Sequence, residues 1–125
     1  MRVKDVMKKI VVVDDDISVK EAAKIMSEKK LGCLIVVSKD EIKGIVTERD
    51  VLKNVDMLSE RVGKIMSKDV ITISPDDSLD DAAKLMSEHE IKRLPVLKNE
   101  DLVGIITATD IIANSNSLNE NFYFD

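Results

Sequence analysis

The sequence predicts an α+β fold in which a β-α-β-β-α unit occurs twice. The first observation is a duplicated motif, because residues 44–50 read GIVTERD and residues 104–110 read GIITATD. The second is a pattern typical of an amphipathic helix that precedes each copy of the motif. The third is a pair of short β-branched runs after that helix, the second of which is part of the motif. We therefore expect two repeats packed face to face with pseudo-twofold symmetry.

The chain of 125 residues divides into two repeats and a tail. We assign residues 1–56 to the first repeat, 57–61 to a linker, 62–114 to the second repeat and 115–125 to a flexible C-terminal tail. A unit of about fifty to sixty residues is too small to bury a sufficient core by itself. The two repeats are expected to pack together and to leave a cleft between them, which is a favoured place for a small ligand.

Each repeat begins with a short turn and a strand. Residues 3–7 read VKDVM and residues 62–66 read VGKIM, so apolar residues recur three and four positions apart. This spacing predicts one helical turn that ends on a methionine. The runs IVVV at 10–13 and VITI at 70–73 follow, and each predicts a buried strand.

An amphipathic helix comes next, at residues 18–30 in the first repeat and 78–90 in the second. The predicted apolar stripe consists of Val19, Ala22, Ala23 and Met26, and then of Leu79, Ala82, Ala83 and Met86. Each helix opens on a serine with an acid three residues later, which is a capping-box pattern. These pairs are Ser18 with Glu21 and Ser78 with Asp81.

Two strands and a final helix complete each repeat. The strands are predicted at 34–37 and 42–46, and again at 94–97 and 102–106, with a polar turn inside each pair. The final helices are predicted to start at Thr47 and Thr107.

Composition favours a globular protein and argues against nucleic-acid binding. Hydrophobic residues make up 44% of the chain and charged residues 34%, which is ordinary for a globular domain. The net charge is −5 and no basic stripe is present. The aromatic residues Phe122, Tyr123 and Phe124 all stand at the C-terminus, so the body of the chain has no platform for stacking bases. Lysine pairs at 8–9 and 29–30 leave nucleic-acid contact as a weaker alternative.

The cysteine content and the terminal residues point to a compartment. Cys33 is the single cysteine, and its apolar surroundings predict a buried small hydrophobic residue. One cysteine makes no intrachain disulfide, which fits a reducing cytoplasm. The first residues lack an apolar signal region, and no run approaches membrane-spanning length. We therefore expect a soluble, cytoplasmic protein without a membrane partner.

Several motifs together carry a family resemblance. Residues 91–96 read IKRLPV, a hairpin follows, and residues 104–110 repeat the motif of residues 44–50. Residues 74–83 read SPDDSLDDAA, and a turn that ends on methionine precedes each repeat. In this order and in two copies, these motifs resemble a tandem pair of cystathionine-β-synthase (CBS) domains, also called a Bateman module.

The resemblance implies a regulatory module rather than an enzyme. Such pairs commonly bind an adenosine-containing ligand in the cleft between repeats, namely AMP, ADP, ATP, S-adenosylmethionine or a dinucleotide. Two pairs often associate through their helices into a homodimer, whose geometry changes on binding and is sensed by an effector protein. A ligand-free scaffold that dimerises or docks on another protein is the alternative.

The duplicated Thr-x-x-Asp pattern supplies the main candidate residues. Thr47 with Asp50, and Thr107 with Asp110, fit a helix cap that needs no ligand. The resemblance adds a second role, in which the aspartates hold the ribose hydroxyls and the threonines lie near phosphate. A carboxylate can accept hydrogen bonds from both hydroxyls, and the free N–H groups at a helix start suit a phosphate.

Further candidate residues follow from the resemblance. Lys92, Arg93 and Pro95 are expected to belong to the ligand site. The two basic residues are expected to meet phosphate, although a solvated basic step explains them equally well. The first repeat departs here, since residues 32–35 read GCLI without a basic pair or a proline. Arg49 is the residue that could compensate there.

The first strand of each repeat supplies the last candidate ligand contacts. The resemblance implies that it borders the adenine ring, and core packing is the alternative. The residues concerned are Thr72, Ile73, Val12 and Val13.

Metal binding and catalysis find little support. The acidic runs at 14–16 and 76–77 lack the glycine spacing of a calcium loop, and acids before a helix are favoured by its dipole. His89 is the single histidine, and neither a nucleophile motif nor a glycine-rich phosphate loop is present. We therefore expect no metal site, no enzymatic activity and no required cofactor.

Overall fold

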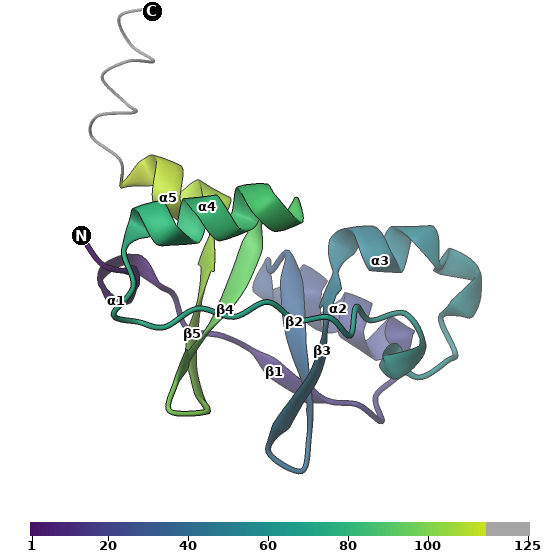
Figure 1. The fold of residues 1–125 in the computed structure, drawn as a ribbon. Helices are drawn as coiled ribbons and strands as arrows, with labels where there is room; N and C mark the ends of the chain where they lie inside the picture. Colours follow the sequence, from purple (N-terminus) through teal and green to yellow (C-terminus); the bar gives the residue numbers. More distant parts are fainter. Residues whose placement is uncertain (115–125) are drawn as a thin grey trace, which may run out of the picture. The chain divides into compact units, whose positions relative to one another are not determined.

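A computed structural model describes residues 1–114 of the chain (Figure 1). The α+β fold with two β-α-β-β-α-like repeats is confirmed, because in each repeat a helix is followed by two consecutive strands and a final helix. The first part of the chain contains α1 (Val3–Val6), β1 (Val12–Asp14), α2 (Val19–Lys29), β2 (Cys33–Ser38), β3 (Glu41–Thr47) and α3 (Glu48–Lys53). Two 3-10 turns follow, η1 (Val55–Met57) and η2 (Val62–Lys64), and then α4 (Leu79–His89), β4 (Arg93–Lys98), β5 (Asp101–Thr107) and α5 (Ala108–Ala113). The predicted tail and its aromatic residues lie outside the described residues.

The chain forms two compact units. Each unit contains the short helical turn that the sequence places at the start of the other repeat. One unit spans Ile10–Val70, so it contains the first repeat together with η2. The other unit joins Met1–Lys9, which includes α1, to the described residues from Ile71 to Asn114. The boundaries that we assigned to the sequence repeats stay a prediction.

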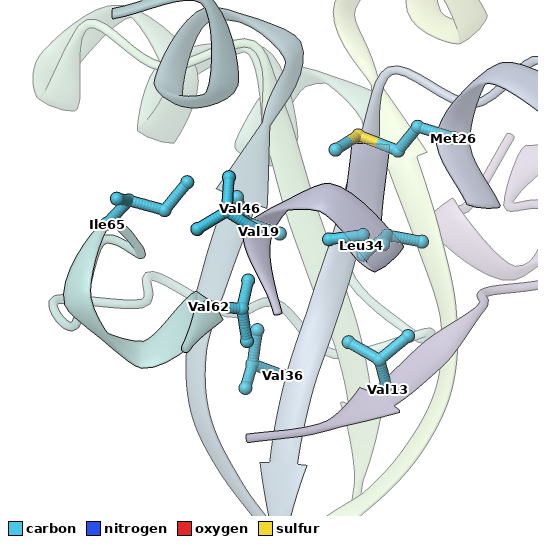
Figure 2. Packing of buried hydrophobic residues seen from close by; sticks show 9 residues of the cluster. Val13, Val19, Met26, Leu34, Val36, Val46, Val62 and Ile65 are labelled. Carbon is cyan, nitrogen blue, oxygen red and sulfur yellow. The ribbon is translucent and has the colours of Figure 1, made fainter. Parts of the chain in front are cut away.

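The unit Ile10–Val70 is built on a sheet with strand order β1-β2-β3. Strand β1 is parallel to β2, and β2 is antiparallel to β3 through a two-residue turn at Lys39 and Asp40. Both turn residues have positive φ values, 52° and 64°, as a type I′ hairpin requires. Side chains from β1, α2, β2, β3 and the η2 region form one hydrophobic core (Figure 2). Its buried members are Val13, Val19, Ala22, Met26, Leu34, Val36, Val46, Val62 and Ile65.

The second unit repeats this arrangement with a shorter first strand. Strands β4 and β5 pair in the same register as β2 and β3, but residues 70–73 contribute only a bridge between Ile73 and Val96. Two prolines explain the difference. In the first repeat the Ile35 N–H donates to the Val11 carbonyl at 3.2 Å, and the Asp15 N–H donates to the Val37 carbonyl at 3.1 Å. Pro95 and Pro75, at the matching positions, have no N–H to donate. The predicted strand at 70–73 is therefore reduced to one bridge.

The core of the second unit also includes a residue from the start of the chain. Val3, in α1, is fully buried and belongs to this cluster. The other buried members are Ile73, Ala82, Met86, Leu94, Val96 and Ile106. The segment Met1–Lys9 is thus part of this core, and not a loose N-terminal extension of it.

The two long helices start where their capping boxes predict. The Ser18 and Ser78 side chains each accept a hydrogen bond at 3.0 Å from the backbone N–H three residues later. The stripe prediction was wrong at one position, because Ala83 is exposed. Ala83 follows the buried Ala82 and therefore lies about 100° further around the helix.

Candidate functional site

The Thr-x-x-Asp motif of the second repeat forms the junction between β5 and α5. The Thr107 N–H donates to Asp110 Oδ2 at 3.0 Å, and the Asp110 N–H donates to Thr107 Oγ1 at 3.2 Å. Asn114 closes the helix by donating to the Asp110 carbonyl at 2.7 Å. These bonds satisfy donors at the helix start that would otherwise lack partners.

The first repeat builds the same cap between β3 and α3. The Thr47 N–H donates to Asp50 Oδ2 at 2.8 Å, and the Asp50 N–H donates to Thr47 Oγ1 at 3.3 Å. Asn54 donates to the Asp50 carbonyl at 2.7 Å. The capping role predicted for both motifs is therefore confirmed, and it does not distinguish the repeats.

The surroundings of the two aspartates differ. Asp110 is only 4% exposed, whereas Asp50 is half-buried. The second oxygen of Asp110, Oδ1, lies 2.9 Å from the ammonium of Lys8, whose own side chain is 69% exposed. Within residues 1–114, Asp50 makes no ion pair. The second motif therefore contains a buried carboxylate that forms an ion pair with a lysine, and the first motif does not.

Gly104 explains why Lys8 can reach Asp110. The N–H and the carbonyl of Lys8 bond to Ile105 at 2.9 and 3.0 Å, so residues 7 and 8 lie along the edge of β5. A Cβ atom on Gly104 would stand 2.9 Å from the Lys8 carbonyl oxygen and 3.0 Å from Met7 Sδ. The glycine of the duplicated motif is thus required by the close approach of the methionine-ending segment.

The unit Ile10–Val70 contains the same crossing, but a different side chain follows its methionine. Ser67 exchanges both backbone hydrogen bonds with Ile45, at 2.9 and 3.0 Å, and Met66 lies over Gly44. Ser67 therefore stands where Lys8 stands in the other unit. Its short neutral side chain supplies no cation to Asp50.

The pairing of β4 with β5 groups three of the predicted ligand residues. Arg93 stands opposite Thr107, and Pro95 stands opposite Ile105. Successive residues of a strand point to opposite faces, so Arg93, Pro95 and Thr107 share one face. Leu94 and its partner Ile106 lie on the other face, in the core.

Lys92 does not share the position of Arg93, and the first repeat has no basic residue at the position that matches Arg93. Lys92 is exposed, and its carbonyl accepts a hydrogen bond at 2.8 Å from the Ala108 N–H. In the first repeat, Cys33 occupies the place opposite Thr47 that Arg93 occupies opposite Thr107. Arg49 is exposed on α3 and makes no ion pair with the described residues. A basic side chain therefore faces the motif across the sheet in the second repeat alone.

The residues predicted to border adenine are divided between core and surface. Ile73 and Val13 belong to the two hydrophobic cores, whereas Thr72 and Val12 are exposed. The Ile73 N–H donates to the Pro95 carbonyl at 3.1 Å, and its carbonyl accepts from the Leu97 N–H at 2.9 Å. The main chain of Ile73 is thus engaged within its sheet, and the adenine contact stays a prediction.

Sequence reasoning missed Lys8 as a site residue and considered it only for nucleic-acid contact. One signal was available, since the position after the methionine of each turn holds lysine in one copy and serine in the other. The sequence does not show that this position lies beside Asp110, because the contact joins segments about a hundred residues apart.

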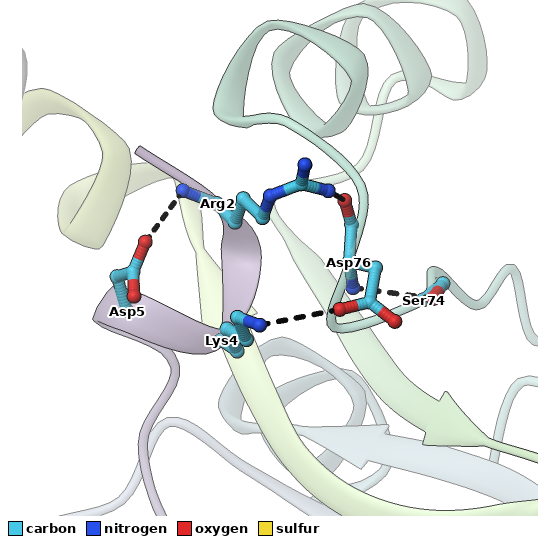
Figure 3. A network of polar contacts seen from close by, with 5 residues as sticks. All are labelled: Arg2, Lys4, Asp5, Ser74 and Asp76. Atoms are coloured by element: carbon cyan, nitrogen blue, oxygen red, sulfur yellow. Dashed lines mark hydrogen bonds and ion pairs between the residues drawn. The ribbon is translucent and has the colours of Figure 1, made fainter.

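A polar network fixes the segment that carries Lys8 (Figure 3). The Arg2 side chain donates to the Asp76 carbonyl, and Lys4 pairs with the Asp76 carboxylate at 3.4 Å. The N–H groups of Val3 and Lys4 donate at 2.9 Å to the carbonyls of Asp77 and Pro75. The acidic turn before α4 is therefore a docking point for α1.

The acidic turn of the first repeat contains coupled carboxylates. The Asp16 N–H donates to Asp14 at 3.1 Å, and this bond lowers the pKa of Asp14. The negative charge of Asp14 in turn raises the pKa of Asp16. In the second repeat Ser74 replaces Asp14 and accepts the matching bond from the Asp76 N–H at 3.2 Å.

Residues 1–114 contain no group of three or more His, Cys, Asp or Glu side chains placed to hold a metal ion.

An apolar groove lies between α2 and α3. Its volume is about 300 Å³, and its lining residues are Ala23, Met26, Ser27, Leu31, Glu48, Val51 and Leu52. Leu52 is 72% exposed, and Ile112 on α5 is 49% exposed. The final helix of each repeat thus presents an uncovered apolar side chain.

No described helix combines the length and the hydropathy needed to cross a membrane.

The CBS domain family matches residues 3–56 and 62–116. The chain belongs to this family and consists, over these residues, of a tandem CBS pair, or Bateman module. This match agrees with the doubled fold and with the duplicated cap.

Three known proteins are similar to the chain. The CBS domain-containing protein YhcV of Bacillus subtilis is 32% identical over 120 residues, which cover 92% of this chain and 86% of YhcV. The uncharacterized protein MJ1232 of Methanocaldococcus jannaschii is 34% identical over 119 residues, but the chain spans only 40% of its length. The CBS pair of protein MJ0100, solved in complex with 5′-methylthioadenosine and S-adenosyl-L-methionine, gives a TM-score of 0.84 at 32% identity. That match covers 90% of this chain and 94% of the solved one.

Proposed function

We propose that the chain is a regulatory module that binds an adenosine-containing ligand at the Thr107–Asp110 motif. The observation that carries this proposal is the buried Asp110 carboxylate, held in place by the cap and facing a cationic side chain. A fixed carboxylate suits the two ribose hydroxyls, because it can accept a hydrogen bond from each. The adenosine compounds bound by the similar MJ0100 pair support this ligand class.

The second repeat also supplies the groups that a phosphate would need. Arg93 shares a face with Thr107, and a guanidinium can bind phosphate oxygens in a bidentate manner. Lys92 is exposed one residue earlier. We propose that Thr107, Asp110, Arg93, Lys92 and Pro95 form the main ligand site. The cleft between the repeats, and the contacts from the first repeat, stay predictions.

A thermal-shift panel with AMP, ADP, ATP, S-adenosylmethionine and NAD tests this function. The protein is unfolded and refolded first, so that a carried-over ligand is removed. A ligand at a hundred times its dissociation constant stabilises the folded state by about 2.7 kcal/mol, which raises the Tm of a domain of this size by several degrees. A shift with one adenosine compound supports the proposal, and no shift with any of them contradicts it.

Self-association through the helices is the second proposed property. The apolar groove between α2 and α3 and the exposed Leu52 favour it, because uncovered apolar surface is a common feature of protein interfaces. We propose a homodimer that transmits the ligand state to an effector protein in the cytoplasm. If no ligand binds, the same surface supports the alternative of a ligand-free dimerising scaffold.

Sedimentation of wild type and Leu52→Glu distinguishes an associating from a non-associating surface. A charge at this exposed position leaves the described core intact but opposes apolar contact. We expect a wild-type dimer and a monomeric variant. A monomeric wild type contradicts both the homodimer and the scaffold.

A further inference from the structure

We propose that Lys8 is a specificity-determining residue that occupies the ribose-binding carboxylate until a phosphate-bearing ligand arrives. This inference rests on the proposed function of the Thr107–Asp110 motif. When the ribose takes the place of the ammonium at Asp110, the ammonium moves to the phosphate of the same ligand. The site therefore favours adenosine 5′-phosphates over uncharged adenosine compounds.

The two oxygens of Asp110 have different partners. Oδ2 accepts the Thr107 N–H at 3.0 Å and is needed for the cap of α5. Oδ1 is the oxygen left for a ligand, and Lys8 Nζ lies 2.9 Å from it. A ribose that binds Oδ1 must therefore compete with the ammonium. An uncharged nucleoside that displaces it gives the ammonium no new partner.

The exposure of the two side chains determines which of them moves. The side chain of Asp110 is 5% exposed and is held by the cap, whereas that of Lys8 is 69% exposed. A lysine ammonium sits on a flexible four-carbon stem and can change its position at little cost. The carboxylate is thus the fixed partner, and the ammonium is the mobile one.

The backbone of Lys8 stays in place during this exchange. Both of its main-chain groups bond to Ile105, and α1 is docked on the turn around Asp76 (Figure 3). Strand β5 pairs with β4 on one edge and with Lys8 on the other. Arg93 and Lys8 therefore reach the Thr107–Asp110 junction from two sides, which places two cations around a phosphate bound there.

The unit Ile10–Val70 lacks this arrangement. Ser67 has the backbone pairing of Lys8 but no charge, and none of the cations in residues 1–114 pairs with Asp50. Cys33 replaces Arg93 opposite the threonine. The preference for phosphate is therefore expected to belong to the second repeat alone.

The test compares AMP with 5′-methylthioadenosine. The two compounds share the adenine and the 2′ and 3′ ribose hydroxyls, and at the 5′ carbon AMP has a phosphate where the other has an uncharged methylthio group. Isothermal titration calorimetry gives the affinities of wild type, Lys8→Met and Lys9→Met. Methionine retains a long apolar side chain without the charge. Lys9 is the matched control, because it is exposed and makes no ion pair with the described residues.

We expect Lys8→Met to lower the affinity for AMP by about tenfold, because one charge-assisted hydrogen bond to the phosphate is lost. The same variant binds 5′-methylthioadenosine more tightly, by about threefold, because the ammonium no longer competes for Asp110. Lys9→Met leaves the ratio of the two affinities as in wild type.

Two results overturn the inference, and they are distinguishable. If Lys8→Met and Lys9→Met have the same AMP to 5′-methylthioadenosine ratio, Lys8 has no role in specificity, but the proposed function stands. If refolded wild type binds neither these two compounds nor any ligand of the thermal-shift panel, the proposed function fails and this inference fails with it. Lys8→Gln, which is polar and uncharged, serves as a second variant if Lys8→Met does not fold.

Discussion

The two repeats have the same backbone arrangement at the duplicated motif but differ in the charged side chains around it. Both have a threonine cap that returns a hydrogen bond to an aspartate, with bond lengths that agree within 0.2 Å. The unit that holds the second motif adds the Lys8 ammonium beside the aspartate and Arg93 opposite the threonine, where the unit Ile10–Val70 has Ser67 and Cys33. The cap is therefore a requirement of the fold, and ligand binding depends on the residues around it.

This difference also shows why the motif alone is weak evidence for a ligand. A Thr-x-x-Asp sequence at a helix start satisfies backbone donors whether or not a ligand binds. The residues that could recognise a nucleotide come from β4 and from the start of the chain, Met1–Lys9. Variants made at matching positions of the two repeats separate the two roles.

The largest expected effect comes from the two cores, and it should be the same in both repeats. Leu34 and Leu94 are fully buried at matching positions of β2 and β4. We expect Leu34→Ala and Leu94→Ala each to lower the free energy of unfolding by about 2–5 kcal/mol, because each leaves a cavity. Urea unfolding measures both. A loss confined to one variant contradicts the equivalence of the cores.

A smaller effect is expected at the glycines of the duplicated motif. A Cβ on Gly44 would stand 2.7 Å from the Ser67 carbonyl oxygen, and one on Gly104 would stand 2.9 Å from that of Lys8. We expect Gly44→Ala and Gly104→Ala each to cost about 1–3 kcal/mol, because backbone has to shift. Thermal unfolding checks this.

Gly63→Ala is the control for these variants, since the nearest atom to its Cβ would be 3.9 Å away. A cost at Gly63 as large as that at Gly44 would show that the crossing segments are not the cause.

The smallest effect concerns the acidic turn before α2. Asp14→Ser copies the second repeat, where Ser74 accepts the matching hydrogen bond. Removing the charge of Asp14 should lower the pKa of Asp16 toward its ordinary value of 3.8. An NMR titration of Asp16 measures this, and an unchanged pKa contradicts the charge coupling.

The sign of the accompanying stability change follows from the two pKa shifts. The lowered pKa of Asp14 stabilises the folded state above the ordinary value of 3.8, and this share is lost as pH falls through the folded pKa. The raised pKa of Asp16 favours the folded state below 3.8, and this share is lost as pH rises through the folded pKa. The two contributions oppose each other. Asp14→Ser should therefore change the Tm little at neutral pH.

The sequence predicted the doubled fold because periodicity and capping are local. The helices of both repeats start at their predicted serine caps, and both hairpins lie where the β-branched runs place them. The exchange of the opening turns between the units was not predictable. A repeat in the sequence shows which segments are alike, but not that α1 would pack with the second repeat.

The candidate site was predictable only in part, for the same reason. The capping roles of Thr107 and Asp110 follow from their spacing, and β-pairing places Arg93 beside them. Lys8 was not predicted as a site residue, because its contact with Asp110 depends on the close approach of a distant segment to Gly104. The exposure of Ala83 and the shortened strand before Pro75 show the limits of helical and strand periodicity at the level of single residues.

The most direct test of the account measures ligand affinity after matched changes at the two aspartates. Isothermal titration calorimetry compares wild type, Asp110→Ala and Asp50→Ala, using the adenosine compound found in the thermal-shift panel. Both variants lose the same capping bonds, so the cap effect is matched. We predict a loss of about tenfold or more for Asp110→Ala and of under about threefold for Asp50→Ala. Equal losses, or a larger loss for Asp50→Ala, would contradict the assignment of the ligand site to the second repeat.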